Sequence, residues 1–295
     1  MKVVFATDGS THSEDAAHFL KWFHFSPEDE FIVLHVVTEI PYDDDWNAGI
    51  KRVIKKVAPR ILKSAVNALG PLKAKITLVE EEGAPDEVIM KVADDLEADL
   101  IVMGARGVTG VKSFFIGSMT MSVAINSSRP LLVTKPSHRR ISQKMNVLFA
   151  TDGSAFAHAT AMFLASMPLP PDTEVTVMNV AWSAISDIPE RYSLEIDDHV
   201  KKDLAKARSI EFEKSEEIID QARPYLSRRF GEIKRVTKGG DPSSEILREA
   251  EIVNADIIAV GSRGVKGMRG MLGSVSRRLL SHAQCAVLVG KMRVR

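Results

Sequence analysis

Residues 4–10 of this chain read Val-Phe-Ala-Thr-Asp-Gly-Ser, and residues 148–154 read Leu-Phe-Ala-Thr-Asp-Gly-Ser. A second pair of matching stretches follows, because residues 104–107 read Gly-Ala-Arg-Gly and residues 261–264 read Gly-Ser-Arg-Gly. The copies lie 144 residues apart at the first stretch and 157 at the second, so the second copy has gained 13 residues. A period of this length is the size of a compact domain and is too long for a solenoid repeat.

The length of 295 residues also suggests two domains. Residues 137–140 read Ser-His-Arg-Arg, a polar stretch suited to an exposed connection between them. We therefore expect a first domain over residues 1–140 and a second over residues 141–295. The extra residues of the second copy are expected in the long polar stretch 199–225, most simply a solvated helix, with a partner-binding helix as the bolder reading.

Short apolar runs alternate with longer amphipathic segments in both copies. The expected strands are residues 2–6, 31–37, 74–79, 100–103 and 131–134, then 146–150, 175–180, 233–236, 257–260 and 286–289. The expected helices are residues 13–22, 84–96, 118–126, 199–225 and 274–283. Most of these runs do not alternate with polar residues, as is typical of strands buried on both faces. The pattern predicts an α/β fold with two doubly wound domains, each with a five-stranded parallel sheet.

Composition excludes several classes of protein. The 39 basic and 39 acidic residues give a formal net charge of zero, and aromatic residues make up 6%, so a nucleic-acid-binding surface is not expected. No apolar stretch is long enough to span a membrane. The lone Cys285 allows no intrachain disulfide and precedes an apolar run, so we expect it in the core of a cytoplasmic protein.

Two loops in each copy carry the chemistry, because ligands of open α/β sheets bind at the carboxyl ends of the strands. Asp8 and Asp152 follow the first strands and can accept hydrogen bonds. The glycines of the second loop let the backbone approach a ligand, and the helix that opens at its end directs N–H groups toward an anion. Ser118 and Thr120 can add hydroxyl donors, and Arg106 positive charge.

Each of these signals is weak alone, because an isolated Asp-Gly-Ser is usually a turn or a helix cap and an isolated Gly-x-x-Gly is usually a loop. Their joint recurrence in both copies favours a ligand site. Patterns of other chemistries are missing from the sequence: Gly-x-x-x-x-Gly-Lys-Ser/Thr, Gly-x-Gly-x-x-Gly after the first strand, His-Glu-x-x-His and Gly-x-Ser-x-Gly. The histidines show no metal-ligand spacing, so no metal site in the protein itself is expected.

These residues resemble the universal stress protein family in its tandem two-domain form, over essentially the whole chain. The family signature is Gly, two residues, Gly, nine residues, Gly and then Ser or Thr. The first copy fits it at Gly104, Gly107, Gly117 and Ser118. The second copy fits at Gly261, Gly264, Gly273 and Ser274, except that eight residues stand between the second and third glycines.

The resemblance implies a three-layer domain like that of the adenine nucleotide alpha hydrolases or of flavodoxin. It implies a bound adenine nucleotide, ATP or AMP, with or without Mg²⁺. In this interpretation Asp8 and Asp152 contact the ribose and adenine side, and backbone at Val36 and Val180 reads the adenine edge. Gly104 and Gly261 lie under the ribose, and the remaining glycines with Ser118 and Ser274 hold the phosphates. The two domains are expected to pair through their last strands.

Three functions stay open. The first is a cytoplasmic stress-response regulator that binds ATP or AMP without fast turnover, since no residue of either loop is a dedicated base for activating water. The second is a slow Mg²⁺-dependent ATPase or transferase. The third is a protein-interaction module with vestigial nucleotide sites, which the shorter second loop favours. Dimerisation of the chain and the identity of a client protein are left open.

Overall fold

The computed structural model describes residues 1–39, 45–107, 116–136, 144–181, 198–265 and 271–292. The expected boundary at residue 140 lies outside these residues, as do the middle parts of both glycine loops.

The first half alternates strands and helices as its sequence predicts. Its elements are β1 (Lys2–Ala6), α1 (Thr11–Leu20), β2 (Glu30–Thr38), α2 (Asp45–Leu69), β3 (Lys75–Gly83), α3 (Pro85–Asp95), β4 (Leu100–Gly104), α4 (Ser118–Asn126) and β5 (Leu131–Thr134). The long helix α2 was not among the expected elements. It contains Pro59 and many lysines and arginines, but its buried residues Ala58, Leu62, Ala65 and Leu69 recur at helical spacing.

The second half repeats this order. Its elements are β6 (Asn146–Ala150), α5 (Ala155–Ser166), β7 (Glu174–Ala181), α7 (Asp198–Phe230), β8 (Ile233–Gly239), α8 (Pro242–Ile252), β9 (Ile257–Gly261), α9 (Ser274–His282) and β10 (Ala286–Gly290). Helix α5 was also not among the expected elements, whereas α8 follows Gly240-Asp241-Pro242, the counterpart of Gly83-Ala84-Pro85 before α3, and the family resemblance implies a helix there. Helix α7 has 33 residues against 25 in α2, so it takes up only part of the expected insertion.

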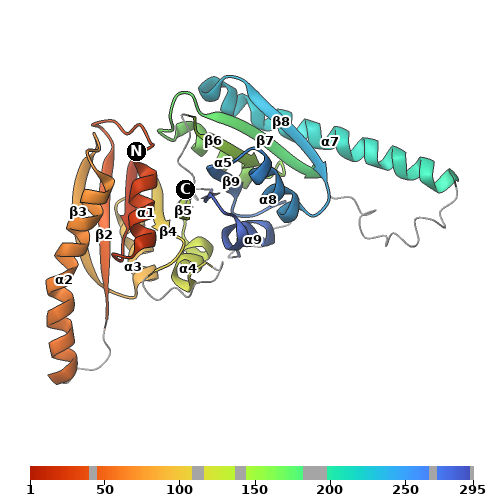
Figure 1. Cartoon of the computed structure of the whole chain (residues 1–295). Coiled ribbons are helices and arrows are strands. Elements are labelled where there is room, and N and C mark those ends of the chain that lie inside the picture. The colour runs from red at the N-terminus through yellow and green to blue at the C-terminus, as the bar shows by residue number, and fades with distance from the viewer. Residues whose placement is uncertain (40–44, 108–115, 137–143, 182–197, 266–270, 293–295) are drawn as a thin grey trace.

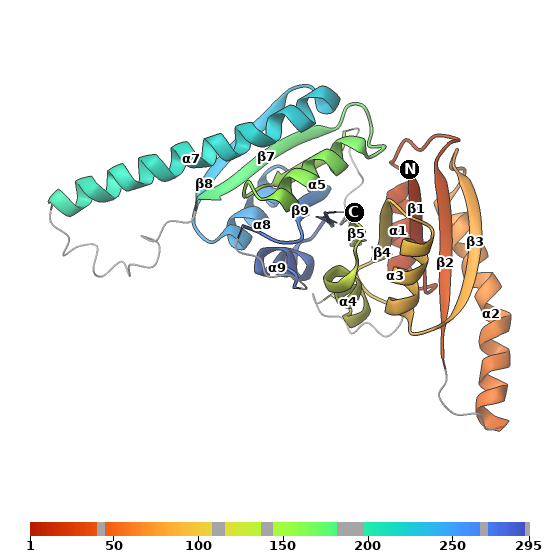
Figure 2. The ribbon, with the colours of Figure 1, turned by 180° about the vertical axis from the view of Figure 1, so that it is seen from behind.

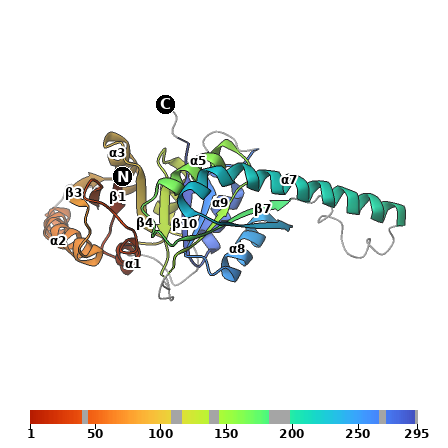
Figure 3. The same ribbon diagram turned by 90° about the horizontal axis from the view of Figure 1, so that it is seen from above.

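Within the described residues, ten strands form one continuous sheet in the order β3-β2-β1-β4-β5-β10-β9-β6-β7-β8. Each half contributes five parallel strands in the order 3-2-1-4-5, which confirms two doubly wound units and differs from the flavodoxin order 2-1-3-4-5. The expected pairing of the last strands is confirmed, because β5 and β10 pair antiparallel with Leu132 opposite Leu288. Figures 1 and 3 show the two halves side by side, with α7 extending beyond its own half.

Helices cover both faces of the sheet. Val3 and Phe5 belong to one buried cluster, with residues of α1, α2, α5 and α7 from both halves. Val4 and Ala6 belong to the opposite cluster, with residues of α3, α4, α8 and α9. Figure 2 shows α3 and α4 over the back of the first half. Successive strand residues thus enter different cores, which explains why the inner strands are apolar without alternation.

The two outermost strands differ from the expectation of burial on both faces. Strands β3 and β8 contain no buried residue. They are the edges of the sheet, and β3 carries three consecutive glutamates, Glu80 to Glu82. Charged side chains on an edge strand oppose pairing with other chains. The exposure of these two strands therefore reflects their position at the edges of the sheet.

Candidate functional site

The turn after the first strand of each half is fixed by its aspartate. The backbone N–H of Ser10 donates to Asp8 Oδ1 at 3.0 Å, and that of Ser154 donates to Asp152 Oδ1 at 3.0 Å. Each serine then caps the following helix, since its hydroxyl accepts a hydrogen bond from the backbone of Ser13 or Ala157. The Asp-Gly-Ser stretch therefore has a local structural function in both copies.

The second carboxylate oxygen of each aspartate faces the glycine loop. A Cβ atom on Gly107 would lie 2.6 Å from Asp8 Oδ2, and one on Gly264 would lie 2.6 Å from Asp152 Oδ2. In the second half the N–H of Val265 also donates to Asp152 Oδ2 at 3.0 Å. The structure thus brings the aspartate and the second signature glycine into contact in both halves.

The first signature glycine allows a helix to approach the sheet. A Cβ on Gly104 would lie 2.7 Å from the carbonyl oxygen of His12 in α1, and a Cβ on Gly261 would lie 3.0 Å from the backbone nitrogen of Ala157 in α5. Any side chain at these positions would push the helix away from the strand. This packing requirement holds for Gly104 and Gly261 whether or not they also lie under a ribose.

The third signature glycine stands at the start of a helix and has no side chain that could cap the helix N-terminus. Gly117 and Gly273 are the N-cap residues of α4 and α9, and neither start has a side-chain cap hydrogen bond. Their φ angles are −65° and −59°, and the nearest atoms to an added Cβ lie at 3.5 Å and 3.4 Å, so the fold does not require glycine there. A missing side chain leaves the first-turn N–H groups open to an anion.

The second half contains a cavity at this edge of the sheet. Its volume is about 380 Å³, within the usual range for small-molecule sites. It is lined by every residue that the second copy was expected to contribute, namely Asp152, Val180, Gly261, Gly264, Gly273 and Ser274. The strands β6, β7 and β9 and the start of α9 bring these residues together from positions more than 120 residues apart.

The first half places its expected residues on the equivalent elements. Asp8 follows β1, Val36 lies near the end of β2, and Gly104 ends β4. Gly107 contacts Asp8, and Ser118 is exposed at the start of α4. Residues 108–115 of this loop lie outside the described part of the chain, so its side of the site is defined by these flanking residues.

The hydroxyl group of Thr120 has a function that differs from the expected one. Thr120 was expected to offer a donor to a phosphate, but it is buried and donates to the carbonyl of Gly104 at 3.1 Å. Ser276 does the same to Gly261 at 2.6 Å. Both tie the new helix to the end of the preceding strand, which fixes the direction of its N-terminus.

Sequence reasoning also missed two polar residues in the second strands. The ring nitrogen Nδ1 of His35 lies 2.9 Å from the carbonyl oxygen of Thr7, and Asn179 donates to the carbonyl of Thr151 at 2.6 Å. Both are buried, and each supports the loop that carries the site aspartate. A polar residue at the same position of an otherwise apolar strand in both copies was the available signal.

Among the described residues that line the cavity of the second half, Arg263 is the cationic one. Its guanidinium lies 5.2 Å from the ring centre of Phe156, and its Nε donates to the carbonyl of Met271 at 3.1 Å. These contacts hold a positive charge beside the loop, where it would favour a negatively charged ligand.

The described residues show neither a grouping suited to a metal ion nor a helix suited to cross a membrane, and their cysteine is not activated. No three His, Cys, Asp or Glu side chains in them are grouped closely enough to hold a metal ion. Among the helices described, none is both long and apolar enough to cross a membrane. Burial raises the pKa of the Cys285 thiol to about 12, against the formation of a reactive thiolate.

The fold and the site together define a tandem α/β protein with a cavity at the carboxyl edge of the second half. The universal stress protein family model matches residues 1–135 and again residues 145–291. The chain belongs to the universal stress protein family.

Relatives cover either one half or the whole chain. A universal stress protein of Methanocaldococcus jannaschii is 30% identical over 152 residues, which are 45% of this chain and 94% of that protein. One from Mycobacterium bovis is 24% identical over 302 residues, covering 98% of this chain and 96% of its own. The crystal structure of a universal stress protein from Archaeoglobus fulgidus covers 98% of this chain and 96% of its own, with 23% identity and a TM-score of 0.63. The last likeness supports the fold.

Proposed function

We propose that the cavity of the second half binds an adenine nucleotide, ATP or AMP, and that the protein acts as a cytoplasmic stress-response regulator rather than as a fast enzyme. The observation that carries the proposal is the meeting of all six expected residues of the second copy around one cavity of about 380 Å³. The family match supports the same ligand class.

In this proposal the phosphates lie at the start of α9. The first-turn N–H groups and the exposed Ser274 donate to phosphate oxygens, and the helix dipole favours their negative charge. The adenine lies against the end of β7, near Met178 and Val180. Asp152 has its carboxylate oxygens bonded to Ser154 and Val265, so it meets the ribose as an already fixed acceptor.

The first half is proposed to hold a second nucleotide with Asp8, Val36, Gly104, Gly107, Gly117 and Ser118. Mg²⁺, where it accompanies ATP, would be held mainly by the phosphates with a serine hydroxyl. In the described parts of both loops we assign no side chain to the activation of water, and the proposal is therefore for binding rather than hydrolysis.

Calorimetry of the full chain with ATP and AMP tests the proposal. Gly273→Val is expected to weaken binding at the second half at least tenfold, because its branched side chain stands where the phosphate must meet the helix N-terminus. Gly49→Ala is the matched control, since nothing lies within 4 Å of a Cβ at Gly49. Equal affinity of the parent and Gly273→Val would show that the phosphate position is wrong.

Single-turnover kinetics separate the regulator from the ATPase. Bound ATP is expected to remain intact for hours after mixing with excess protein and Mg²⁺. Release of phosphate within minutes would favour the enzyme. Absence of any binding heat in the parent protein would leave the interaction module as the remaining function.

A further inference from the structure

The two halves differ at one equivalent position beside the junction of β5 and β10. In the parallel pairing of β4 with β5, Ile101 lies opposite Leu131, and in that of β9 with β10, Ile258 lies opposite Val287. This register makes Arg129, two residues before β5, the counterpart of Cys285, just before β10. The equivalent helices α3 and α8 make Asp94 the counterpart of Glu251.

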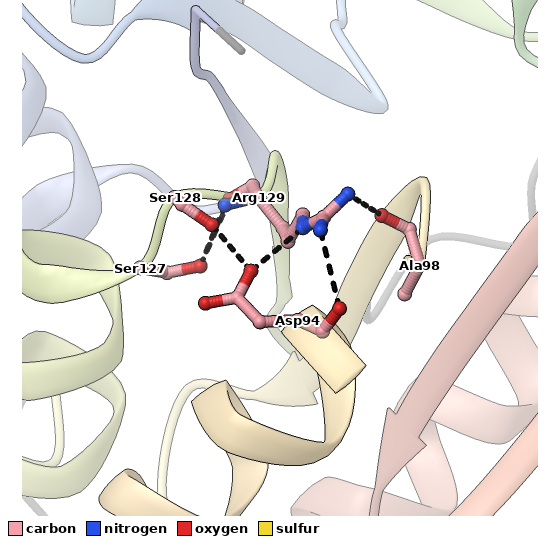
Figure 4. Close-up of polar contacts among 5 residues, drawn as sticks. All are labelled: Asp94, Ala98, Ser127, Ser128 and Arg129. Atoms are coloured by element: carbon pink, nitrogen blue, oxygen red, sulfur yellow. Dashed lines mark hydrogen bonds and ion pairs between the residues drawn. The ribbon is translucent and has the colours of Figure 1, made fainter. Parts of the chain in front are cut away.

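In the first half this position is filled by an arginine side chain. Arg129 Nε donates to Asp94 Oδ1 at 2.8 Å, and its terminal nitrogens donate to the carbonyls of Ala98 at 3.2 Å and Asp94 at 3.4 Å. Ser128 donates to the same carboxylate oxygen at 2.6 Å. Figure 4 shows the guanidinium lying between the end of α3 and the strand that follows. The acceptors of this helix end are thus satisfied by the chain itself.

The second half has the acceptors without the donor. Glu251 takes the place of Asp94, and Ala255 takes the place of Ala98, with the same hydrogen bond from its N–H to the residue five positions earlier. Gln284 and Cys285 replace Ser128 and Arg129, and neither side chain bonds to Glu251. In the described part of the chain, the Glu251 carboxylate has no hydrogen-bond or ion-pair partner.

A cavity lies where the arginine is missing. Its volume is about 510 Å³, and Glu251, Ala255, Gln284 and Cys285 line it. The first half closes the opposite side with Phe19, Ile116 and Lys135. The cavity therefore offers a solvent-exposed carboxylate and a helix end beside a lining that both halves of one chain contribute.

Neighbouring cations do not prevent a guanidinium from lying there. Lys135 and Arg106 also line the cavity, and the Lys135 ammonium donates to the carbonyl of Ala283 at 2.5 Å. The first half tolerates the same arrangement, because Lys291 donates to the carbonyl of Ala124 at 2.7 Å while Arg129 occupies its position near the same helix. Each lysine is directed to a helix C-terminus and leaves the carboxylate to the guanidinium.

We propose that this cavity between the halves is a binding site for a small molecule that carries a guanidinium group, held by Glu251 in the way that Asp94 holds Arg129. The ligand supplies the planar donor that Cys285 does not. The site is separate from the nucleotide cavity of the second half.

Ligand-observed saturation-transfer NMR of the full chain tests the proposal without nucleotide. The probe is methylguanidinium, and methylurea is its uncharged control of the same shape. Methylguanidinium is expected to receive saturation from the protein, whereas methylurea is not. Glu251→Gln is expected to weaken the binding at least tenfold, and Glu232→Gln, an exposed glutamate outside the cavity, is expected to leave it unchanged.

A second variant tests the position of the guanidinium. Cys285→Arg is expected to abolish methylguanidinium binding, because its own side chain would take the place that Arg129 has in the first half. If this variant fails to fold, the comparison of Glu251→Gln with Glu232→Gln still decides. Equal binding of methylguanidinium to the parent and Glu251→Gln, equal saturation of methylurea, or no saturation of either probe would overturn the proposal.

Discussion

At the scale of single residues, the glycines of one signature serve different purposes. Gly107 faces a carboxylate that is fixed by hydrogen bonds to Ser10, so a side chain there meets an obstacle inside the protein. A Cβ on Gly117 would make only ordinary van der Waals contacts, the nearest at 3.5 Å from the carbonyl oxygen of Ala105, so a side chain there meets no such obstacle. The same difference separates Gly264 from Gly273 in the second half.

This difference gives a prediction for the first half. Gly117→Val is expected to abolish nucleotide binding there and to change the free energy of unfolding by less than about 1 kcal/mol. Gly107→Val is expected to abolish binding and also to destabilise the protein by about 1–3 kcal/mol, because its Cβ would overlap Asp8. Urea denaturation and calorimetry of both variants provide the measurement. Equal stability loss in the two variants would contradict the assignment of Gly117 to ligand contact.

Arg129 gives a second prediction at this scale. Arg129→Ala is expected to destabilise the chain by about 1 kcal/mol, since the Asp94 side chain is 48% exposed and solvent screens the pair. Burial raises the pKa of Asp94, but hydrogen bonds from Ser128 and Arg129 outweigh it and lower the pKa below 3.8. The stabilisation is therefore complete above pH 3.8 and is lost as the pH falls through the folded value.

Urea denaturation of the parent and Arg129→Ala at pH 6 and pH 3 measures this effect. The difference between their unfolding free energies is expected to shrink at the lower pH. A difference that stays constant would mean that the arginine acts by packing rather than through the carboxylate.

At the scale of elements, the contact between the end of the last strand and the first helix is made by different residue pairs in the two halves. Gly290 ends β10 against α5, and a Cβ there would lie 1.9 Å from the Oγ1 atom of Thr160. The equivalent positions of the first half hold Thr134 and Ala16, both buried. The larger residue is on the helix in one half and on the strand in the other.

This exchange predicts a measurable coupling. Gly290→Thr is expected to destabilise the chain by about 1–3 kcal/mol, because the core has no room for both threonines. The double variant Gly290→Thr, Thr160→Ala recreates the first-half pair and is expected to recover at least half of that loss. A double-mutant cycle of unfolding free energies measures the coupling. Additive effects would show that the two positions are independent.

At the scale of the whole molecule, two lysines connect the halves reciprocally. Lys135 of the first half donates to Ala283 at the end of α9, and Lys291 of the second donates to Ala124 in α4. The N–H of His24 also donates to the carbonyl of Pro168 at 2.6 Å. Together with the β5–β10 pairing and a core shared by both halves, these contacts make the chain one folded body.

The lysines predict a pH dependence of stability. Burial lowers the pKa of Lys135 and of Lys291 from 10.5 to about 8. In the window between these values the unfolded chain binds more protons than the folded one, so stability rises with pH. The destabilisation is complete below pH 8 and is relieved as the pH increases.

Lys135→Met and Lys291→Met remove this titration while keeping most of the side-chain volume. The stability of the parent relative to either variant is expected to increase between pH 7 and pH 10, as measured by urea denaturation. A relative stability that is flat over this range would show that the ammonium groups are not desolvated at the junction.

The sequence predicted the elements best where a pattern was local. The strand Leu131–Thr134 and the helix Ser118–Asn126 have the expected bounds, because an apolar run and a glycine before a helix are visible within a few residues. Helix α2 was missed although its buried residues Ala58, Leu62, Ala65 and Leu69 recur every three or four positions, so a local helical pattern was present there and was overlooked. The six residues predicted for the second copy line one cavity, but the supporting Asn179 and Ser276 were not predicted, because their partners lie on other elements.

The sequence by itself determined two α/β halves, their alternating elements and the loops that carry aspartate and glycine, because turn chemistry and hydrophobic periodicity act between near neighbours in the chain. Only the tertiary structure decided that the last strands pair antiparallel with Leu132 opposite Leu288, and that an arginine fills one side of their junction while a cavity remains on the other. Those outcomes depend on packing between residues such as Lys135 and Ala283, which are 148 positions apart. No local sequence pattern predicts which carbonyl or carboxylate such a side chain will contact.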